Sequence, residues 1–183
     1  RRLQRRIQFL QRRTYREVIN LLLDQKLDFA LICGFPYVRN KAELRLVAVP
    51  LSDGRPVYRS YLVVPAADAA TRSILDLRGK VFAFSDPDSN SGFLYPNFAL
   101  LDLAERPDAF FSKTFFTWSH RNTVDAIAAG LAHGGAVDSY VWETLRLLRP
   151  RIAVETRVAA QSPEFGHTPF VARRGVARND VLS

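Results

Sequence analysis

The chain has 183 residues, of which 48% are hydrophobic and 24% charged, and its formal net charge is +8. No apolar run approaches the roughly 18 residues that a membrane-spanning helix needs, and the single cysteine, Cys33, excludes an internal disulfide and a cysteine-built zinc site. Seven arginines stand among the first 20 residues beside one acid, Glu17, and without a nucleic-acid-reading motif they favour a solvated edge over a surface for nucleic acid or membrane.

The first third of the chain predicts one helix among short strands. Thr14 and Glu17 have the spacing of a capping box, which predicts a helix that ends near residue 25. Apolar or alternating runs predict strands over residues 7–10, 27–33, 44–51 and 57–64. The strand–helix–strand order at the start predicts a parallel pair, and the turn-rich segment 52–56 predicts a hairpin between the last two strands.

The rest of the chain repeats a strand followed by a helix. Strands are predicted over residues 81–84, 113–118, 136–138, 152–158 and 168–172. Helices are predicted over residues 93–105, 123–132 and 140–148. This alternation is typical of an α/β domain with a mostly parallel sheet.

Residues 85–92, between the strand at 81–84 and the next helix, are a cluster of turn and cap residues. A strand that leads into a hydroxyl-rich loop at a helix start aims several N–H groups at one spot, which attracts an oxyanion. Ser89, Asn90 and Ser91 add side-chain donors. We call residues 85–92 the anion loop, although spacing alone favours an ordinary helix cap.

Polar residues also follow other predicted strands. Ser119 and His120 follow one strand, Asp138 ends another, and Tyr37 lies just past a third. Ligands of open α/β sheets bind beyond the carboxyl ends of strands, so this convergence favours an anion site over a cap. A calcium loop is excluded because Ser91 and Asn97 occupy the positions where an EF-hand needs Gly and Glu. We expect no metal and no cofactor.

Five segments together resemble the phosphonate- and phosphate-type substrate-binding proteins of ABC importers. They are RRTYREVINLL, DFALICGFPYV, DLRGKVFAFSDPDSNSGFLYP, SHRNTVDAIAAGLAHGGAVDSYVWE and SPEFGHTPFVARR. The resemblance implies a two-lobed α/β fold, the periplasmic-binding-protein type II fold, with mostly parallel sheets and with this chain incomplete at both ends. It places residues 1–64 and 165–183 in the first lobe, residues 72–160 in the second, and crossovers at 65–71 and 161–164.

The resemblance also implies a ligand site. Its residues would be Tyr15, Tyr37, Ser89, Asn90, Ser91, His120 and Asp138. The two tyrosines would close over the ligand from the first lobe, and His120 would donate a charge-assisted bond when it is protonated by the field of the ligand. Asp138 would accept a bond from a ligand oxygen that carries a proton, which phosphonate and phosphate supply near neutrality and sulfate does not.

Two positions depart from the family's pattern. Asn90 stands where Thr is common, and Tyr140 stands where a protein that recognises an aminophosphonate would place a carboxylate. Recognition of an amino group is therefore in doubt. Phosphate, phosphite or another small oxyanion stay open as ligands.

The function implied is capture of a small oxyanion in the periplasm, or otherwise outside the cytoplasm, and its delivery to the permease of an ABC transporter, without catalysis. No nucleic-acid partner is expected, and membrane contact would come only through the permease or a lipid anchor outside this sequence. One alternative is the ligand-sensing domain of a signalling receptor with the same fold. A serine hydrolase using His120 and Asp138 is less favoured, because no Gly-x-Ser-x-Gly motif is present.

Overall fold

The computed structural model describes residues 7–177, apart from the side chains of residues 152 and 153. These residues form two compact units. The smaller unit holds the residues up to Pro50 and those from His167 onward, and the larger unit is Leu51–Gly166. The chain therefore leaves the smaller unit once and returns to it once.

The boundaries differ from the crossovers expected at 65–71 and 161–164. Strand β4, Ser60–Pro65, lies inside the sheet of the larger unit, where it pairs with strands on both sides. Its side chains Val63 and Val64 are completely buried. A segment with two neighbouring strands and a buried face belongs to the core of a unit, so the passage between units lies before it, next to Pro50.

The smaller unit is a three-stranded antiparallel sheet packed against two helices. Its elements are α1 (Tyr15–Leu23), β1 (Phe29–Leu31), α2 (Gly34–Arg39), β2 (Leu44–Ala48) and β10 (Phe170–Arg173), with the strand order β1-β10-β2. The predicted capping box is present, since the Thr14 hydroxyl accepts from the Glu17 N–H at 3.2 Å and the Glu17 carboxylate accepts from the Thr14 N–H at 2.9 Å.

Several predictions for this part of the chain are wrong. Residues 7–10 are not a strand, and β1 pairs antiparallel with β10 instead of forming a parallel pair with an earlier strand. Residues 44–51 and 57–64 form no hairpin, because β2 and β4 lie in different sheets. The strands β2 and β4 each pair with strands from distant parts of the chain, and local sequence patterns do not reveal such partners.

The larger unit is built on a five-stranded mixed sheet in the order β6-β5-β7-β4-β8. Its strands are β4, β5 (Val81–Phe84), β6 (Lys113–Phe116), β7 (Gly134–Asp138) and β8 (Thr156–Gln161). The strands β6, β5 and β7 run parallel, while β4 is antiparallel to both β7 and β8. Two short strands, β3 (Val57–Tyr58) and β9 (Phe165–Gly166), pair separately.

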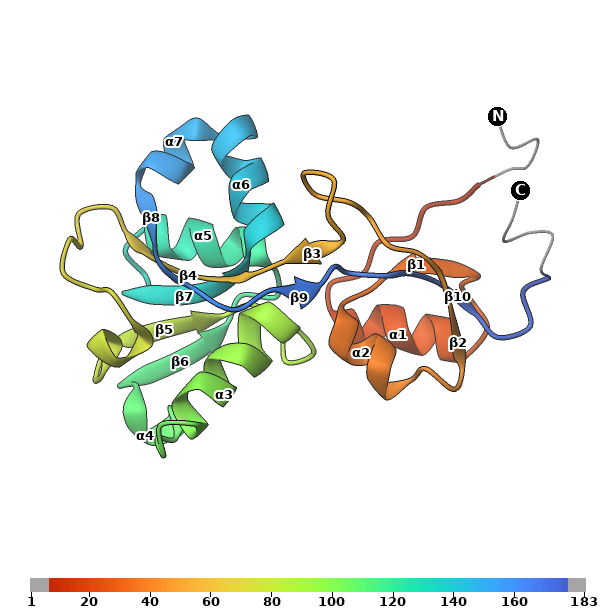
Figure 1. Cartoon of the computed structure of the whole chain (residues 1–183), viewed down its shortest axis with the longest axis horizontal. Coiled ribbons are helices and arrows are strands. Elements are labelled where there is room, and N and C mark those ends of the chain that lie inside the picture. The colour runs from red at the N-terminus through yellow and green to blue at the C-terminus, as the bar shows by residue number, and fades with distance from the viewer. Residues whose placement is uncertain (1–6, 178–183) are drawn as a thin grey trace. The chain divides into compact units, whose positions relative to one another are not determined.

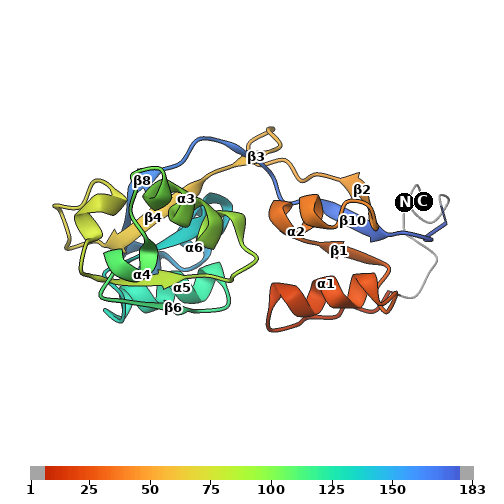
Figure 2. The ribbon, with the colours of Figure 1, turned by 90° about the horizontal axis from the view of Figure 1, so that it is seen from below.

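Helices cover both faces of this sheet. They are η1 (Ile74–Leu77), η2 (Asn90–Leu94), α3 (Tyr95–Leu101), α4 (Pro107–Phe110), α5 (His120–Ala128), α6 (Ser139–Leu148) and α7 (Pro150–Val154). In Figure 1, α3 and α4 lie below the sheet and α5–α7 above it, and Figure 2, seen from below, brings α3 and α4 to the front.

Alternation along the strands explains the two layers. On β5, Phe82 and Phe84 pack into the cluster that contains Leu100 of α3, whereas Ala83 between them packs into the cluster that contains Val124 of α5. Successive side chains of a strand point to opposite faces, so one apolar run supports two helical layers. The strand β5 is thereby held rigidly, and the anion loop begins where it ends.

Candidate anion-binding site

The anion loop joins β5 to a turn of π-helix that leads into α3. The turn η2 begins at Asn90, with the Ser89 hydroxyl as its cap accepting from the Gly92 N–H at 3.0 Å. The Leu94 N–H donates to the Ser89 carbonyl at 3.0 Å, five residues back. The helix was expected from residue 93, so it starts earlier and its first turn is made of the polar residues of the loop. Pro96 lies in the first turn of α3, where its missing N–H costs nothing.

Gly92 allows the loop to lie directly against neighbouring side chains. A Cβ at this position would stand 1.7 Å from the Ser85 Oγ and 2.9 Å from the His120 Cε1. Real Cβ atoms do not approach other atoms so closely, so every other residue would displace the loop. Gly92 is therefore a further candidate residue of the site, selected by close backbone approach and not by side-chain chemistry.

His120 connects the starts of three helices. Ser119 caps α5, with its hydroxyl accepting from the Asn122 N–H at 3.1 Å, and His120 is the first residue of that helix. The His120 Nε2 lies 3.3 Å from the hydroxyl oxygen of Ser89, the cap of η2. The His120 Nδ1 accepts at 3.1 Å from the backbone N–H of Asp138, the cap of α6.

These contacts determine which ring nitrogen carries the proton. Because the Nδ1 of His120 accepts a bond, the proton of the neutral ring is on Nε2 and is directed at Ser89. The Ser89 oxygen therefore accepts two bonds, one from His120 and one from Gly92. Among residues 7–177 the structure gives the Ser89 hydroxyl proton no acceptor, and the residue is completely buried.

His120 is neutral in the protein without a ligand. Burial lowers the pKa of His120 to about 4, because desolvation penalises the imidazolium form. Protonating the ring would also remove the acceptor of the Asp138 N–H. Protonation of the ring in the field of a bound anion stays a prediction.

Two further hydroxyls of the anion loop are buried without a partner in the described part of the chain. They belong to Ser85, where β5 ends, and to Ser91 in η2. The Ser91 backbone is held from behind, since the Ser60 hydroxyl donates to its carbonyl at 2.7 Å. Leaving a buried hydroxyl unpaired costs roughly 1–3 kcal/mol, so a group that accepts from these hydroxyls recovers that free energy.

Asp138 provides the acceptor of the site. Its side chain is buried and accepts from the Tyr140 N–H at 2.8 Å. Burial raises the pKa of Asp138 to about 6, because the charged carboxylate is poorly solvated there. A carboxyl group with such a pKa can share a proton with an oxyanion near neutrality.

The remaining predicted residues have more local roles. The Asn90 side chain donates to the Tyr58 hydroxyl at 3.0 Å, which ties η2 to β3. Five of the seven predicted residues lie in the larger unit. Ser89, Asn90 and Ser91 belong to the anion loop, His120 begins α5, and Asp138 caps α6. Tyr15 starts α1 and Tyr37 lies in α2, both half-buried in the smaller unit. Their part in binding stays a prediction.

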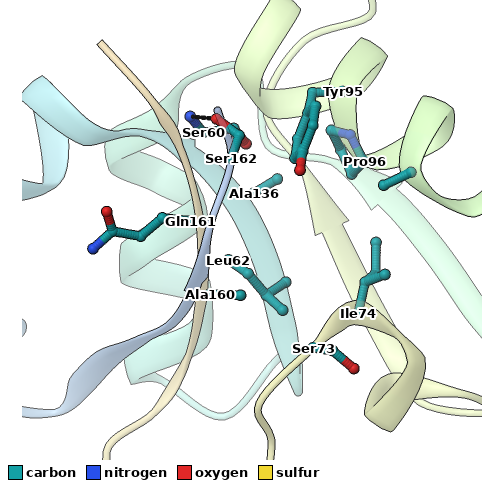
Figure 3. Close-up of a pocket in the computed structure, with 11 residues that line it drawn as sticks. Ser60, Leu62, Ser73, Ile74, Tyr95, Pro96, Ala136, Ala160, Gln161 and Ser162 are labelled. Carbon is teal, nitrogen blue, oxygen red and sulfur yellow. Dashed lines mark hydrogen bonds between the residues drawn. The ribbon is translucent and has the colours of Figure 1, made fainter. Parts of the chain in front are cut away.

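A separate apolar cavity of about 180 Å³ lies in the larger unit between the sheet and α3 (Figure 3). It is lined by Ser60, Leu62, Ser73, Ile74, Tyr95, Pro96, Ala99, Ala136, Ala160, Gln161 and Ser162. No lining side chain carries a charge, so its chemistry does not suit an anion. Ser60 and Tyr95 connect it to the anion loop, since the Ser60 hydroxyl donates to the Ser91 carbonyl and the Tyr95 backbone N–H donates to the Asn90 carbonyl.

The described residues contain neither a cluster of metal ligands nor a membrane-spanning helix. No group of three or more His, Cys, Asp or Glu residues within 7–177 is arranged to hold a metal ion. None of the helices described above has the length and apolar character needed to cross a membrane.

Comparison with known proteins identifies relatives along nearly the whole chain. The family described as "ABC transporter, phosphonate, periplasmic substrate-binding protein" matches residues 1–181. The chain is 29% identical over 152 residues to the phosphate-import protein PhnD of Mycolicibacterium smegmatis, an alignment that covers 76% of this chain and 47% of that protein.

Solved structures share the fold. A binding protein component of an ABC phosphonate transporter from Pseudomonas aeruginosa has a TM-score of 0.79 at 23% identity, over 92% of this chain and 58% of that one. PhnD1 from Prochlorococcus marinus, in complex with methylphosphonate, has a TM-score of 0.79 at 21% identity, over 88% of this chain and 62% of that one. The chain thus spans about half the length of the curated relative and about three fifths of these solved chains.

These likenesses confirm the predicted α/β fold of type II periplasmic binding proteins. Parallel pairing within it is confined to β6, β5 and β7, and the sheet of the smaller unit is wholly antiparallel. Since the match extends over nearly all of the sequence, the chain belongs to the family of phosphonate periplasmic substrate-binding proteins of ABC transporters.

Proposed function

We propose that the protein captures a small phosphorus oxyanion, a phosphonate or phosphate, at the anion loop for import by an ABC transporter. The observation that carries this proposal is the set of hydroxyls without acceptors where three helix starts meet. Ser89 and Ser91 supply two such hydroxyls. The first N–H groups of a helix lack partners within the helix and sit at the positive end of its dipole, which favours an anion beside them.

Asp138 supports a phosphorus oxyanion over sulfate. An ionised carboxylate repels a fully ionised ligand, but it accepts a hydrogen bond from a ligand that retains one proton. Phosphate and phosphonate retain such a proton near neutrality, whereas sulfate does not. The raised pKa of Asp138 allows the proton to be shared from either side.

Tyr140, two residues after Asp138, supports a ligand without an amino group. Tyr140 stands where a carboxylate would pair with the ammonium group of an aminophosphonate, and it is about half exposed at 52%. A phenol hydroxyl does not provide the charge that an ammonium group needs. Phosphate, phosphite and methylphosphonate are therefore preferred over 2-aminoethylphosphonate in this proposal.

The geometry of His120 supports binding without catalysis. A serine hydrolase needs an imidazole nitrogen with a free lone pair to take the serine proton, and a carboxylate that accepts from the other ring nitrogen. Here the nitrogen that faces Ser89 carries the proton, and the Asp138 backbone donates to the ring. Both polarities are opposite to those of a catalytic triad, so we infer that the protein is not an enzyme.

The relatives support a transport role and a periplasmic location. A relative is named as a phosphate-import protein, and a solved relative as part of a phosphonate transporter. We infer that this protein likewise works in the periplasm with an ABC permease. The relatives are transport proteins, which favours import over the receptor alternative.

Calorimetric titration of the full-length protein tests the ligand class. The ligands are methylphosphonate, 2-aminoethylphosphonate, phosphate, phosphite and sulfate. We expect tight binding of at least one phosphorus oxyanion, weak binding of the aminophosphonate and no binding of sulfate. Heat from sulfate alone, or from none of the five, would overturn the proposal.

A further inference from the structure

We propose that the smaller unit carries a basic surface that binds the anionic phospholipid headgroups of a membrane directly. We call this surface the basic edge, and its exposed members are Arg39, Lys41, Arg45 and Arg174 with the apolar Val38 and Leu46. The proposal goes beyond the anion loop, which belongs to the larger unit, and it does not depend on which ligand binds there. It adds a direct contact to the membrane contact expected through the permease or a lipid anchor.

The net positive charge of the protein belongs to one of its two units. The segments of the smaller unit, residues 1–50 and 167–183, contain 14 Lys and Arg but only five Asp and Glu. The larger unit, Leu51–Gly166, contains 12 Lys and Arg and 13 Asp and Glu, so it is nearly neutral. Because a net charge attracts partners of the opposite sign, the excess draws an anionic partner to the smaller unit and not to the larger one.

Strand pairing brings the cations of the basic edge to one end of the three-stranded sheet. Residues 39–45 lead from the end of α2 into β2, and β10 runs beside β2 in the opposite direction. Arg173 is the register partner of Leu44. The Arg174 N–H donates to the Glu43 carbonyl at 2.9 Å. The start of β2 and the end of β10 are therefore adjacent, as Figure 1 shows, and cations from two distant segments share one end of the sheet.

The four cations of the basic edge are not neutralised within the described part of the chain. All four are exposed, and none forms an ion pair with another of residues 7–177. Their neighbour Arg173, by contrast, is paired with Asp28 at 2.8 Å, and Lys26 is paired with Asp24 at 3.3 Å. A cation without an internal partner keeps its full attraction for an external anion.

Exposed aliphatic side chains among these cations favour a lipid surface over an acidic protein as the partner. Val38 is 63% exposed and Leu46 is 46% exposed, and each is next in sequence to an arginine of the basic edge. Protein surfaces that lie on membranes combine Lys and Arg with apolar side chains that enter the headgroup region. The family consists of periplasmic substrate-binding proteins of ABC transporters, so a negatively charged bilayer is an extended polyanion within reach of such a protein.

Co-sedimentation of the full-length polypeptide, free of any lipid attachment, with phospholipid vesicles tests the proposal. We expect binding to vesicles of mixed phosphatidylglycerol and phosphatidylcholine, and no binding to phosphatidylcholine alone. High salt should release the protein, because it screens the attraction between exposed charges. Equal binding to both vesicles, or binding to neither, would overturn the proposal. Binding only to phosphatidylcholine vesicles that contain the permease would also overturn it and make the basic edge a protein interface.

Two quadruple variants with the same change in net charge separate the basic edge from charge in general. The first carries Arg39→Gln, Lys41→Gln, Arg45→Gln and Arg174→Gln. The control removes four exposed cations of the larger unit that form no ion pair with any described residue, by Lys80→Gln, Lys113→Gln, Arg149→Gln and Arg151→Gln. Each cation near an anionic surface strengthens binding about fivefold, so the first variant should bind at least about tenfold more weakly and the control within about threefold of wild type. Equal losses in the two variants would contradict the proposal.

A tryptophan probe tests the same surface without removing any charge. Val38→Trp places an indole at a position of the basic edge that is already exposed. After subtraction of the wild-type signal, its emission should shift to shorter wavelength when vesicles with phosphatidylglycerol are added, because indole favours the headgroup region. Leu147→Trp, at a position of the larger unit that is 77% exposed, is the control and should show no shift. A shift at residue 147 and none at residue 38 would overturn the proposal.

Discussion

The anion loop and the apolar cavity lie in the same unit and share Ser60, but they offer a ligand opposite chemistry. The cavity has volume, about 180 Å³, and walls of Leu62, Ile74 and alanines with no charge. The loop has buried hydroxyls without acceptors, at Ser85 and Ser91, where helix starts meet. Empty space in an apolar wall is tolerated at the cost of lost packing, whereas an unpaired buried hydroxyl requires a polar partner to be stable.

The proposed ligand site of this protein is therefore the region with unsatisfied donors and not the region with volume. An anion is bound by hydrogen-bond donors fixed in place before it arrives, and little space is needed for a group of a few atoms.

The largest effect is expected at Gly92, on the polar side of the comparison. Gly92→Ala would place a Cβ 1.7 Å from the Ser85 Oγ, so the loop must move away from Ser85 and His120. We expect oxyanion binding to fall below detection in calorimetry and the free energy of unfolding to drop by about 1–3 kcal/mol. Gly166→Ala is the control, because its Cβ meets nothing within 4 Å. Binding that survives Gly92→Ala would show that the observed loop geometry is not required.

The titration of Asp138 gives the next largest effect. Burial raises its pKa from 3.8 to about 6, so the stability it contributes is complete below about pH 4 and is lost as the pH rises through 6. A shift of this size corresponds to roughly 3 kcal/mol. The side chain introduced by Asp138→Asn does not ionise. The free energy of unfolding of the variant, measured relative to that of wild type, should therefore rise by about that amount from pH 4 to pH 7.

His120 should show the opposite trend. Burial lowers its pKa from 6.5 to about 4, so its contribution is complete above about pH 6.5 and is lost as the pH falls toward 4. His120→Gln should therefore gain stability relative to wild type on acidification. Urea denaturation at pH 4 and pH 7 measures both variants. Differences from wild type that do not change with pH would mean that neither group is buried as the structure shows.

Ser91→Ala separates binding from stability. We expect it to weaken oxyanion binding by about 1–3 kcal/mol, since its hydroxyl would donate to a charged oxygen. Its free energy of unfolding should stay unchanged or rise, because the hydroxyl removed has no partner among the described residues. Ser60→Ala is the matched control, because its hydroxyl is paired with the Ser91 carbonyl and its loss should cost about 1 kcal/mol of stability. If the affinity of Ser91→Ala is unchanged, Ser91 is only part of a helix start.

Local patterns were sufficient for the elements that build the loop. The apolar run of β5, the cap residues after it and Asp138 at the end of β7 were all predicted from neighbours in the sequence. Helix α2 was missed because Gly34 and Pro36 are typical turn residues, although proline is tolerated where a helix has not yet formed its internal bonds. Residues 152–154 were predicted as strand but belong to α7, which Pro150 opens just as Pro36 lies in the first turn of α2.

Strand pairing and hydrogen-bond polarity could not be predicted in the same way. β1 pairs with β10, which lies far from it along the chain, and no local pattern in the sequence encodes that pairing. Which ring nitrogen of His120 carries the proton depends on two groups from distant parts of the chain, the backbone N–H of Asp138 and the hydroxyl of Ser89. The sequence therefore predicted a set of candidate residues, five of which lie in the larger unit, while their donor and acceptor roles required the structure.

The smallest expected effect lies in the apolar cavity. Ala160 of β8 lines it, and Ala160→Val would fill part of it with two methyl groups of a residue that favours strands. We expect the free energy of unfolding to rise by about 0.5–1 kcal/mol. Affinity for phosphate and methylphosphonate should not change, because Ala160 is not one of the lining residues that bond to the loop, Ser60 and Tyr95.

Ala48→Val provides the matched control for strand propensity. Ala48 lies on β2, is exposed and does not line this cavity, so a gain that both variants share would come from propensity and only the excess at Ala160 from filled space. Calorimetric titration of Ala160→Val decides the comparison between the two regions. Unchanged affinity keeps the cavity a packing feature, whereas a selective loss of methylphosphonate would make it the place of the organic group, and volume would then matter to this site after all.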